Sequence, residues 1–335
     1  MDSGNRVKKG EVTMKPELII VSRKTGKIFN CSNSTTSIKW ETVRTGTPGK
    51  LEFTLIKSGD LSFLEGDPVR FSIDGKLQFY GWVFTKSKDR WDVITVTCYD
   101  RLRYLKANAS YAFYAMSAGG IVKQIANDFK LAVGTLDNTG YALPSLVEED
   151  QCCLDIIGAA VQQTLLNTAK IFVFYDDGSG LCLREAAQMK SNIVIGTQSY
   201  LTDYTYKTDI DQQTYNYIKL ARPNQTTGRT DVFIAEDTAN IAEWGLLQLY
   251  QSIDENLNDA QAKEQAKTAL AYYNRRLRTL SCSSLGVPGL RAGMMIGLNI
   301  PQLGDINLNQ DVLLEKVTHT FENEKHTMNF ETMAI

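Results

Sequence analysis

The two histidines of the chain, His319 and His326, lie close together near its C-terminal end. Imidazole is a common choice for acid–base catalysis and for metal binding near neutral pH. If residues 322–325 form a four-residue loop, Phe321 faces His326, and both imidazoles fall on the apolar face of a β-hairpin. A metal site would need a third ligand, for which Glu315 is the only local candidate. We therefore expect histidines that are held by backbone groups in a core or an interface.

Two acidic groups could also do chemistry. Glu148, Glu149 and Asp150 form the one dense cluster of carboxylates, which could supply a general acid and a general base. The same cluster precedes a predicted helix, where acidic side chains cap free amides and complement the helix dipole, and we favour that role. Asp176 and Asp177 precede a glycine in a turn and suggest calcium, but the remaining ligands of a twelve-residue calcium loop are missing.

The cysteines and the known catalytic signatures point away from an enzyme. The sequence contains no nucleophile elbow, phosphate-binding loop, zinc-protease helix or dinucleotide-binding fingerprint. No C-x-x-C pair occurs, so neither a zinc cluster nor a disulfide framework is indicated, and we expect reduced cysteines that serve packing. We therefore predict no catalytic residue, no metal and no cofactor. The six cysteines are Cys31, Cys98, Cys152, Cys153, Cys182 and Cys282.

The composition excludes several other classes of function. The 335 residues include 36 basic and 38 acidic side chains, and the formal net charge of −2 does not favour nucleic-acid recognition or an anionic membrane. No apolar run approaches the ~18 residues of a membrane span, so we expect no stable membrane insertion. The N-terminal stretch lacks the apolar core of a signal peptide, which indicates folding in a cytoplasm.

Periodicity predicts a chain that is mainly β with helices in its middle. Residues 1–15 carry charge without periodicity and are expected to form a flexible arm. Short alternating strands separated by glycine-containing turns follow, which is typical of a small barrel or sandwich. Apolar residues at helical spacing predict three helices, over residues 117–130, 151–167 and 258–277.

One hairpin of the first third allows a prediction of register. Its strands bury one face each if Ile73 lies opposite Leu77 across a three-residue loop. A two-residue loop of Asp74 and Gly75 would instead place polar side chains on the apolar face. Because a slip of one residue reverses every side chain, we expect the three-residue loop.

Two distant stretches repeat the same order of elements: a strand, a glycine-containing turn into a second strand, and closing strands. Two copies indicate duplicated β-domains, with Gly66 and Gly293 at equivalent turns. The first stretch comprises residues 51–55, 64–71 and 93–100, and the second comprises residues 279–282, 290–296, 312–319 and 326–331. We expect a first β-domain over 16–106, an α+β insert over 107–190, connecting strands over 191–207, and a second β-domain with the long helix over 208–335.

Three segments carry a resemblance that spans nearly the whole chain from about residue 16. They are Thr97–Leu105 (TCYDRLRYL), Ile241–Gln248 (IAEWGLLQ), and Val317–Phe321 with His326–Met328. In this order they resemble the XkdQ/YqbQ-type hub proteins of contractile phage tails and phage-tail-like bacteriocins. The resemblance implies two tail-tube-like β-barrel domains plus a small α+β domain.

The same resemblance implies a structural role in a tail baseplate, in a virion or a bacteriocin particle that is assembled in a bacterial cytoplasm. Such hubs are similar to trimers whose six β-barrels form a pseudo-sixfold ring between the sixfold tail tube and the threefold central spike. The implied partners are two further copies of the chain, the tail tube protein, the spike protein and other baseplate proteins. Contact with the tape-measure protein is left open.

Two alternatives belong to other classes of protein. A peptidoglycan-degrading hydrolase would need two carboxylates about 5–9.5 Å apart across a groove, for which Glu148 or Glu149 with Asp176 or Asp177 are the candidates. A carbohydrate- or receptor-binding module would need exposed aromatic side chains. Tyr111, Phe113 and Tyr114 are the candidates for that role, although a hydrophobic seam between domains explains them as well.

Overall fold

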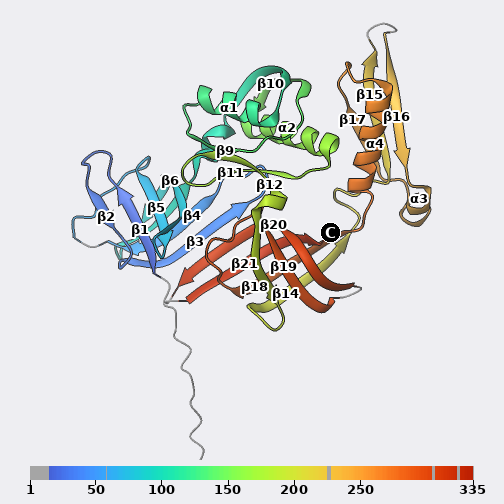
Figure 1. The fold of residues 1–335 in the computed structure, drawn as a ribbon. Helices are drawn as coiled ribbons and strands as arrows, with labels where there is room; N and C mark the ends of the chain where they lie inside the picture. The colour runs from blue at the N-terminus through green and yellow to red at the C-terminus, as the bar shows by residue number, and fades with distance from the viewer. Residues whose placement is uncertain (1–14, 58, 225–227, 304–305, 323–324, 335) are drawn as a thin grey trace, which may run out of the picture.

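The computed structural model describes residues 15–57, 59–224, 228–303, 306–322 and 325–334. It is built mainly from β-strands, which confirms the predicted class. One large sheet carries most of the strands, a helix-containing insert lies over it, and a small separate sheet stands at one side (Figure 1). The predicted arm over 1–15 falls almost wholly on residues 1–14, which lie outside the described residues. Within the described ranges, no helix is long and apolar enough to cross a membrane.

The N-terminal half of the large sheet is antiparallel and has the strand order β3-β4-β7-β6-β5-β1-β2. Alternate side chains of β4 point into the core of this half. Leu51, Phe53 and Leu55 are therefore buried in one cluster with apolar side chains of the adjacent strands. The strands are β1 (Pro16–Val21), β2 (Ile28–Asn30), β3 (Thr35–Val43), β4 (Lys50–Ile56), β5 (Pro68–Ile73), β6 (Lys76–Lys88) and β7 (Val93–Tyr99).

The C-terminal half has the strand order β14-β18-β21-β20, with β19 beside β20 and β13 beside β19. Its core contains Leu280, Ile296, Val317 and Phe330. The strands predicted as connections over 191–207 are therefore part of this half. The strands are β13 (Lys190–Gly196), β14 (Leu201–Asp209), β18 (Leu277–Leu285), β19 (Met295–Leu303), β20 (Ile306–Glu322) and β21 (Lys325–Ala334).

The two halves repeat one strand order. The run β3-β4-β7-β6-β5 of the first half corresponds to the run β14-β18-β21-β20-β19 of the second. Both halves also carry two β-bulges at corresponding places, each of which inserts one extra residue into a strand. The bulges lie between Thr35 and Ser37 and between Val83 and Thr85 in the first half, and between Leu201 and Asp203 and between Leu314 and Lys316 in the second.

Gly66 and Gly293 occupy equivalent turns in these two halves. Their φ angles are 86° and 89°, in the region that favours glycine. The Gly66 amide donates to the Val83 carbonyl at 2.8 Å, and the Gly293 amide donates to the Leu314 carbonyl at the same distance. In each half the acceptor is the residue just before a bulge. The match in strand order, bulges and turns supports the duplication read from the sequence.

The two halves are nevertheless fused, which differs from the two separate barrels expected from the sequence. Strand β20 hydrogen-bonds to β3, and this pairing joins both halves into one 13-stranded sheet. The blue strands β3 and β4 therefore lie beside the red strands β20 and β21 (Figure 1). A strand pattern specifies which face is buried but not which strand lies at each edge, so the fusion was not predictable.

The insert contains two short sheets and two helices. Strand β8 pairs with β10, while β9, β12 and β11 form a three-stranded sheet. Helix α1 begins after Ser117, where the sequence predicts the start of a helix, and the Ser117 side chain accepts from the Gly120 amide. The short helix η1 (Arg101–Lys106) leads from the first half into the insert. The elements of the insert are β8 (Asn108–Met116), α1 (Ala118–Asp128), β9 (Val133–Leu136), β10 (Leu143–Cys152), α2 (Cys153–Thr168), β11 (Phe172–Asp176), β12 (Leu181–Glu185) and η2 (Ala186–Met189).

The long helix predicted over 258–277 exists, but it does not pack on the second β-domain. It is α4 (Asp259–Tyr273), and Asn258 and Gln261 close its N-terminus as a capping box. Ala262, Ala266 and Ala269 pack on a separate sheet with the order β16-β15-β17, shown in orange in Figure 1. This unit also contains β15 (Tyr217–Asn224), β16 (Arg229–Glu236), α3 (Thr238–Trp244) and β17 (Gln248–Ser252).

The predicted register of the β5–β6 hairpin is wrong at its tip. Ile73 pairs with Lys76, and the loop consists of Asp74 and Gly75, both with positive φ. A register shift between Phe71 and Ser72 then restores the apolar face, because Phe71 pairs with Phe79 further along the hairpin. The two-residue turn therefore sets the pairing at the tip, and the bulge returns the apolar side chains further along the hairpin to the buried face.

The two equivalent glycines should differ in their tolerance of a side chain. Gly66→Ala meets open space and should lose about 1–2 kcal/mol from the positive φ alone. Gly293→Ala should lose about 1–3 kcal/mol more, because the new Cβ would lie 2.3 Å from Cγ1 of Val173. Urea unfolding of both variants measures the difference. Adding Val173→Ala to Gly293→Ala should recover part of the loss, and equal losses for the two glycines would contradict this account.

Candidate functional site

The pairing of β20 with β3 forms the junction between the two halves. It runs from Lys316 opposite Val43 to Glu322 opposite Ser37. On the core side, Trp40 stacks on His319 with a ring-centroid distance of 5.0 Å, and Phe71 meets Phe321 edge-on at 5.3 Å. The junction is thus dry and aromatic, with Trp40 3% and His319 1% exposed.

The predicted register of the histidine hairpin is confirmed, since Phe321 pairs with His326. Glu322 also pairs with Lys325, so the loop is shorter than the four residues that we predicted, and residues 323–324 lie outside the described residues. Nδ1 of His319 lies 2.9 Å from Nε2 of His326, and Nε2 of His319 lies 2.7 Å from the Leu290 carbonyl oxygen. As expected, a backbone group holds His319 within a core.

Both imidazoles are neutral in this environment. Burial lowers the pKa of His319 from 6.5 to about 4. Burial also lowers the pKa of His326, to about 3, and the neighbouring His319 contributes to the shift. The His326 ring lies against the Gly286 backbone so closely that a Cβ at Gly286 would come within 2.1 Å of it. The pair is therefore a packed core element.

The third ligand considered for a metal site is engaged elsewhere. Glu315 accepts a hydrogen bond from Nε of Arg44 at 2.7 Å, which forms an ion pair across the two halves. No group of three or more metal-ligating side chains is present among the residues that the structure describes. The site around His319 and His326 thus offers no third ligand from Glu315.

On the polar side of the junction, the ion pair of Glu41 and Lys316 crosses between the two halves. Glu41 of β3 lies 3.1 Å from Nζ of Lys316 on β20 and 3.9 Å from Nζ of Lys50 on β4. Burial alone would raise the pKa of Glu41, but its hydrogen bond with Lys316 and the charges of the two lysines outweigh it and leave that pKa lowered. The junction is therefore apolar on one face and paired in charge on the other.

A buried charge cluster joins both halves to the insert. Arg101, at the end of the first half, donates from Nη1 to both carboxylate oxygens of Asp176 in the insert, at 2.8 and 2.9 Å. Arg291 of the second half donates to the backbone carbonyl of Asp176 at 2.8 Å. Asp100 accepts from the Gly49 and Leu102 amides, at 2.8 and 3.0 Å.

Desolvation dominates the electrostatics of this cluster. Burial raises the pKa of Asp100 well above its ordinary value, and the carboxylate of Asp176 raises it further. Burial lowers the pKa of Arg291, whose guanidinium lies 4.1 Å from the centre of the Tyr175 ring. Such a cluster resembles a perturbed catalytic site, but Arg101 and Arg291 are bound to Asp176 of the insert, and Asp100 is bound to the Gly49 and Leu102 amides. We interpret it as structural.

The acidic residues proposed for helix capping lie elsewhere than predicted. Glu148, Glu149 and Asp150 belong to strand β10, and Cys152 occupies the N-cap of α2 without a side-chain hydrogen bond. The capping prediction is therefore wrong. A bulge between Glu148 and Gln151 extends the strand up to the helix, so the carboxylates follow the strand instead of the helix end.

The turn after β11 uses its two aspartates for structure. Asp176 is bound to Arg101, while Oδ1 of Asp177 accepts from the Ser179 amide at 2.8 Å and the Gly180 amide at 3.0 Å. These hydrogen bonds close the turn and lower the pKa of Asp177 against the opposing effect of its burial. The carboxylates serve the turn and the domain junction.

The three aromatic residues considered for ligand binding do not share one exposed surface. Phe113 is buried in the core of the insert. Tyr111 stacks on Phe113 at 5.1 Å and donates to Asp128 at 2.9 Å, and only Tyr114 is largely exposed. The six cysteines are free, and all except the half-buried Cys152 are buried, as the sequence predicts.

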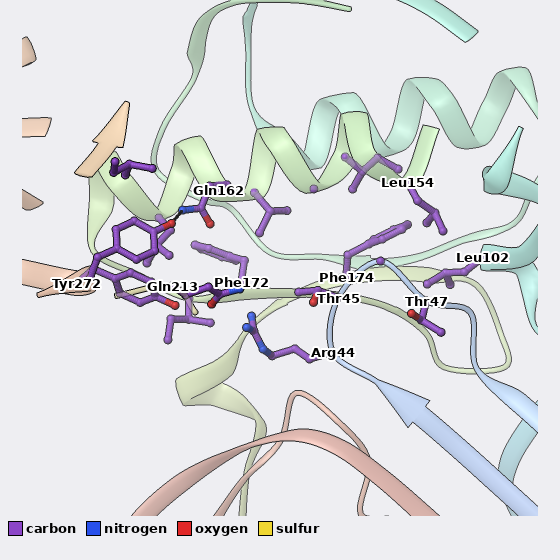
Figure 2. A pocket seen from close by; sticks show the side chains of 18 of the residues that line it. Arg44, Thr45, Thr47, Leu102, Leu154, Gln162, Phe172, Phe174, Gln213 and Tyr272 are labelled. Carbon is purple, nitrogen blue, oxygen red and sulfur yellow. Dashed lines mark hydrogen bonds between the residues drawn. The ribbon is translucent and has the colours of Figure 1, made fainter. Parts of the chain in front are cut away.

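A cleft of about 430 Å³ lies between α2, the loop after β3 and the small sheet unit. Leu154 and Gln162 project from α2 on one side, Arg44 and Thr45 lie opposite, and Tyr272 stands at one end (Figure 2). Arg44 is the only charged side chain among its lining residues, and it is bound to Glu315. The cleft therefore lacks a pair of carboxylates for acid–base chemistry.

The fold defined by these elements is similar to that of a solved tail protein. A tail protein from Neisseria meningitidis has a TM-score of 0.72 with this chain at 12% identity, over 96% of each chain. Residues 38–333 match the YqbQ-like family, and the chain belongs to this family.

Two relatives from Bacillus subtilis are similar over most of their length. The uncharacterized protein YqbQ is 32% identical over 307 residues, which cover 89% of this chain and 92% of the relative. The phage-like element PBSX protein XkdQ is 29% identical over 304 residues, which cover 89% and 91% of the two chains. The family expected from the three sequence segments is thus confirmed.

The sequence reasoning missed the residues that join the domains. Arg101, Asp176 and Arg291 are far apart in the sequence, and no local pattern marks them as partners. Asp176 was considered for calcium and catalysis because it precedes Asp177 and a glycine. The basic Arg291 close to the turn glycine Gly293 could have suggested a buried ion pair or hydrogen bond at that turn.

Acid should unfold the protein through the two histidines. Their folded pKa values of about 4 and 3 lie below the unfolded value of 6.5, so the unfolded state binds protons first as the pH falls. Stability should fall by about 1.4 kcal/mol per pH unit for each histidine between about pH 6 and 4. His326→Phe should lose about half of this dependence. Urea midpoints across the pH range measure it.

A direct check is available because the chain has only two histidines. Their ring protons in NMR spectra should not titrate near pH 6.5 in the folded protein. A transition of either ring near that pH would contradict the buried pair.

Proposed function

We propose that the chain is a structural hub of a tail baseplate, in a virion or a tail-like particle, and that three copies form a ring between the tail tube and the central spike. The duplication carries the proposal, because three chains with two equivalent halves present six similar units to a sixfold tube. The threefold symmetry of the chains themselves suits a threefold spike.

The geometry of the large sheet is compatible with such a ring. Each chain contributes the run β14-β18-β21-β20-β3-β4-β7-β6, in which four strands of one half are followed by the four equivalent strands of the other. Three copies of this run, at a strand spacing of about 4.8 Å and a tilt of about 40°, would close a barrel of about 48 Å diameter. Its polar face, which carries Glu41, Lys50 and Lys316, would line the channel.

The proposed partners follow from this position. One face of the ring would meet the tail tube protein and the other the spike protein, with other baseplate proteins at the periphery. The family relative XkdQ belongs to a phage-like element, and the structural neighbour from Neisseria meningitidis is a tail protein, which supports this setting. Contact with the tape-measure protein would depend on what fills the channel.

A non-enzymatic role is part of the proposal. The candidate carboxylates Asp176 and Asp177 are tied to Arg101 and to turn amides. Glu148 and Glu149 lie on a strand of the insert. This arrangement favours neither the hydrolase nor, given the buried Phe113, the carbohydrate-binding alternative.

The stoichiometry tests the hub directly. Quantitative mass spectrometry of intact particles should count this chain in a multiple of three, because only three copies complete six units. Peptides of the tail tube protein provide the internal control, since they should occur in multiples of six. A chain count that is not a multiple of three would rule the hub out.

The non-enzymatic role is tested by zymography on peptidoglycan. We expect the purified protein to show no lysis, and we expect Glu148→Gln at a half-buried position and Glu149→Gln at an exposed one to leave its stability within about 0.5 kcal/mol. A lysis band that disappears in either variant would overturn this part of the proposal and favour the hydrolase.

A further inference from the structure

The geometry points to a specific contact between copies of this chain: the open edge of β14 pairs with β6 of a second copy, in the register in which β20 pairs with β3 within one chain. The inference rests on the proposed ring and deepens it, because it names the strands and the residues that close the ring.

One edge of β14, and the last part of one edge of β6, pair with no other strand in the part of the chain that the structure describes. Strand β14 pairs with β18 along one edge only. Strand β6 pairs with β7 along one edge, and its pairing with β5 on the other edge ends at Trp82. Within the described residues, no strand pairs with Thr85–Lys88 on that second edge. An exposed strand edge is a template for another chain.

The equivalent strands of the other half show how these edges are used. Strand β20, the counterpart of β6, also pairs along its second edge with β19 and then, after the bulge at Glu315, with β3. Strand β3 is the counterpart of β14. If the two junctions of a ring are alike, the junction between chains joins β6 to β14 as the junction within a chain joins β20 to β3.

The matched bulges and pairings set the register. Val83 corresponds to Leu314, so Thr85 corresponds to Lys316. In the same way Trp40, opposite Leu51, corresponds to Tyr206, opposite Leu280. Transferring the β20–β3 register gives the pairs between chains. They are Thr85 with Asp209, Lys86 with Thr208, Ser87 with Lys207, and Lys88 with Tyr206.

The side chains on the two edges suit each other. At the core-facing positions, the aromatic pair Trp40 and His319 of the inner junction is replaced by Tyr206 and Lys88. A lysine over a tyrosine ring is a favourable pair that tolerates water before assembly. The exposed Lys88, which is paired with Asp92 in the single chain, also guards the β6 edge against indiscriminate pairing, whereas Lys86 donates to the Phe63 carbonyl of its own half.

This difference explains why one junction forms during folding and the other during assembly. Phe321 and Trp40 are buried in the single chain, whereas Lys88 is exposed and Tyr206 is half-buried. A dry aromatic seam would expose a large apolar surface on a free chain, and a polar seam does not. The two junctions therefore share one strand geometry, but the junction within a chain carries buried aromatic side chains and the junction between chains carries more polar ones.

Engineered disulfides test the register. Ser87→Cys and Lys207→Cys are exposed positions that should lie directly opposite between chains. Within one chain they lie at opposite ends of the eight-strand run, about 34 Å apart across the sheet, so they cannot link internally. Particles carrying the double variant should yield covalent dimers and trimers on oxidation, and a mixture of the two single variants should yield dimers only.

The matched control is Ser87→Cys with Asp203→Cys, which lies on the same face of β14 but about 13 Å from the predicted partner. It should not link. If the control links equally, or if 87 and 207 fail to link in particles that contain the chain in multiples of three, the strand pairing is wrong while the hub stands. If the count itself is not a multiple of three, the hub fails, which separates the two failures.

Discussion

A β-strand has only two hydrogen-bonding edges, and the architecture of this protein depends on how β20 divides one of them. Along one edge β20 pairs with β21; along the other it pairs first with β19 and then, past the bulge at Glu315, with β3. The bulge turns the strand so that its second half can leave its own domain and join the other. The fused sheet and the aromatic seam of Trp40 and His319 both follow from this division.

The insert is held to the fused sheet by buried charge and by the apolar cluster of Val173, Ala186 and Leu313. Arg101 and Arg291 converge on Asp176 from the two halves, and both bring guanidinium groups into a buried setting. Buried ion pairs add little net stability, but losing one partner leaves an uncompensated charge, so they strongly disfavour other arrangements of the domains. The cluster therefore specifies the orientation of the insert more than it stabilises the fold.

The perturbed pKa values of this protein all have structural causes. His319 and His326 are neutral because burial lowers their pKa values. Burial, together with the nearby carboxylate of Asp176, raises the pKa of Asp100. None of these three side chains lines the cleft below α2. The chain belongs to the YqbQ-like family, and its fold is similar to that of a solved tail protein.

Local patterns in the sequence determined the β class, the starts of α1 and α4 at Ser117 and Asn258, and the histidine hairpin, because capping and face alternation act between near neighbours. The duplication was visible as well, since turns such as Gly66 and Gly293 need particular residues. The tertiary structure alone decided the fusion through β20 and β3, the bulge that corrects the β5–β6 hairpin, and the convergence of Arg101 and Arg291 on Asp176. These contacts join residues that are distant in the sequence, and the choice among edges and buried partners depends on the whole packed chain.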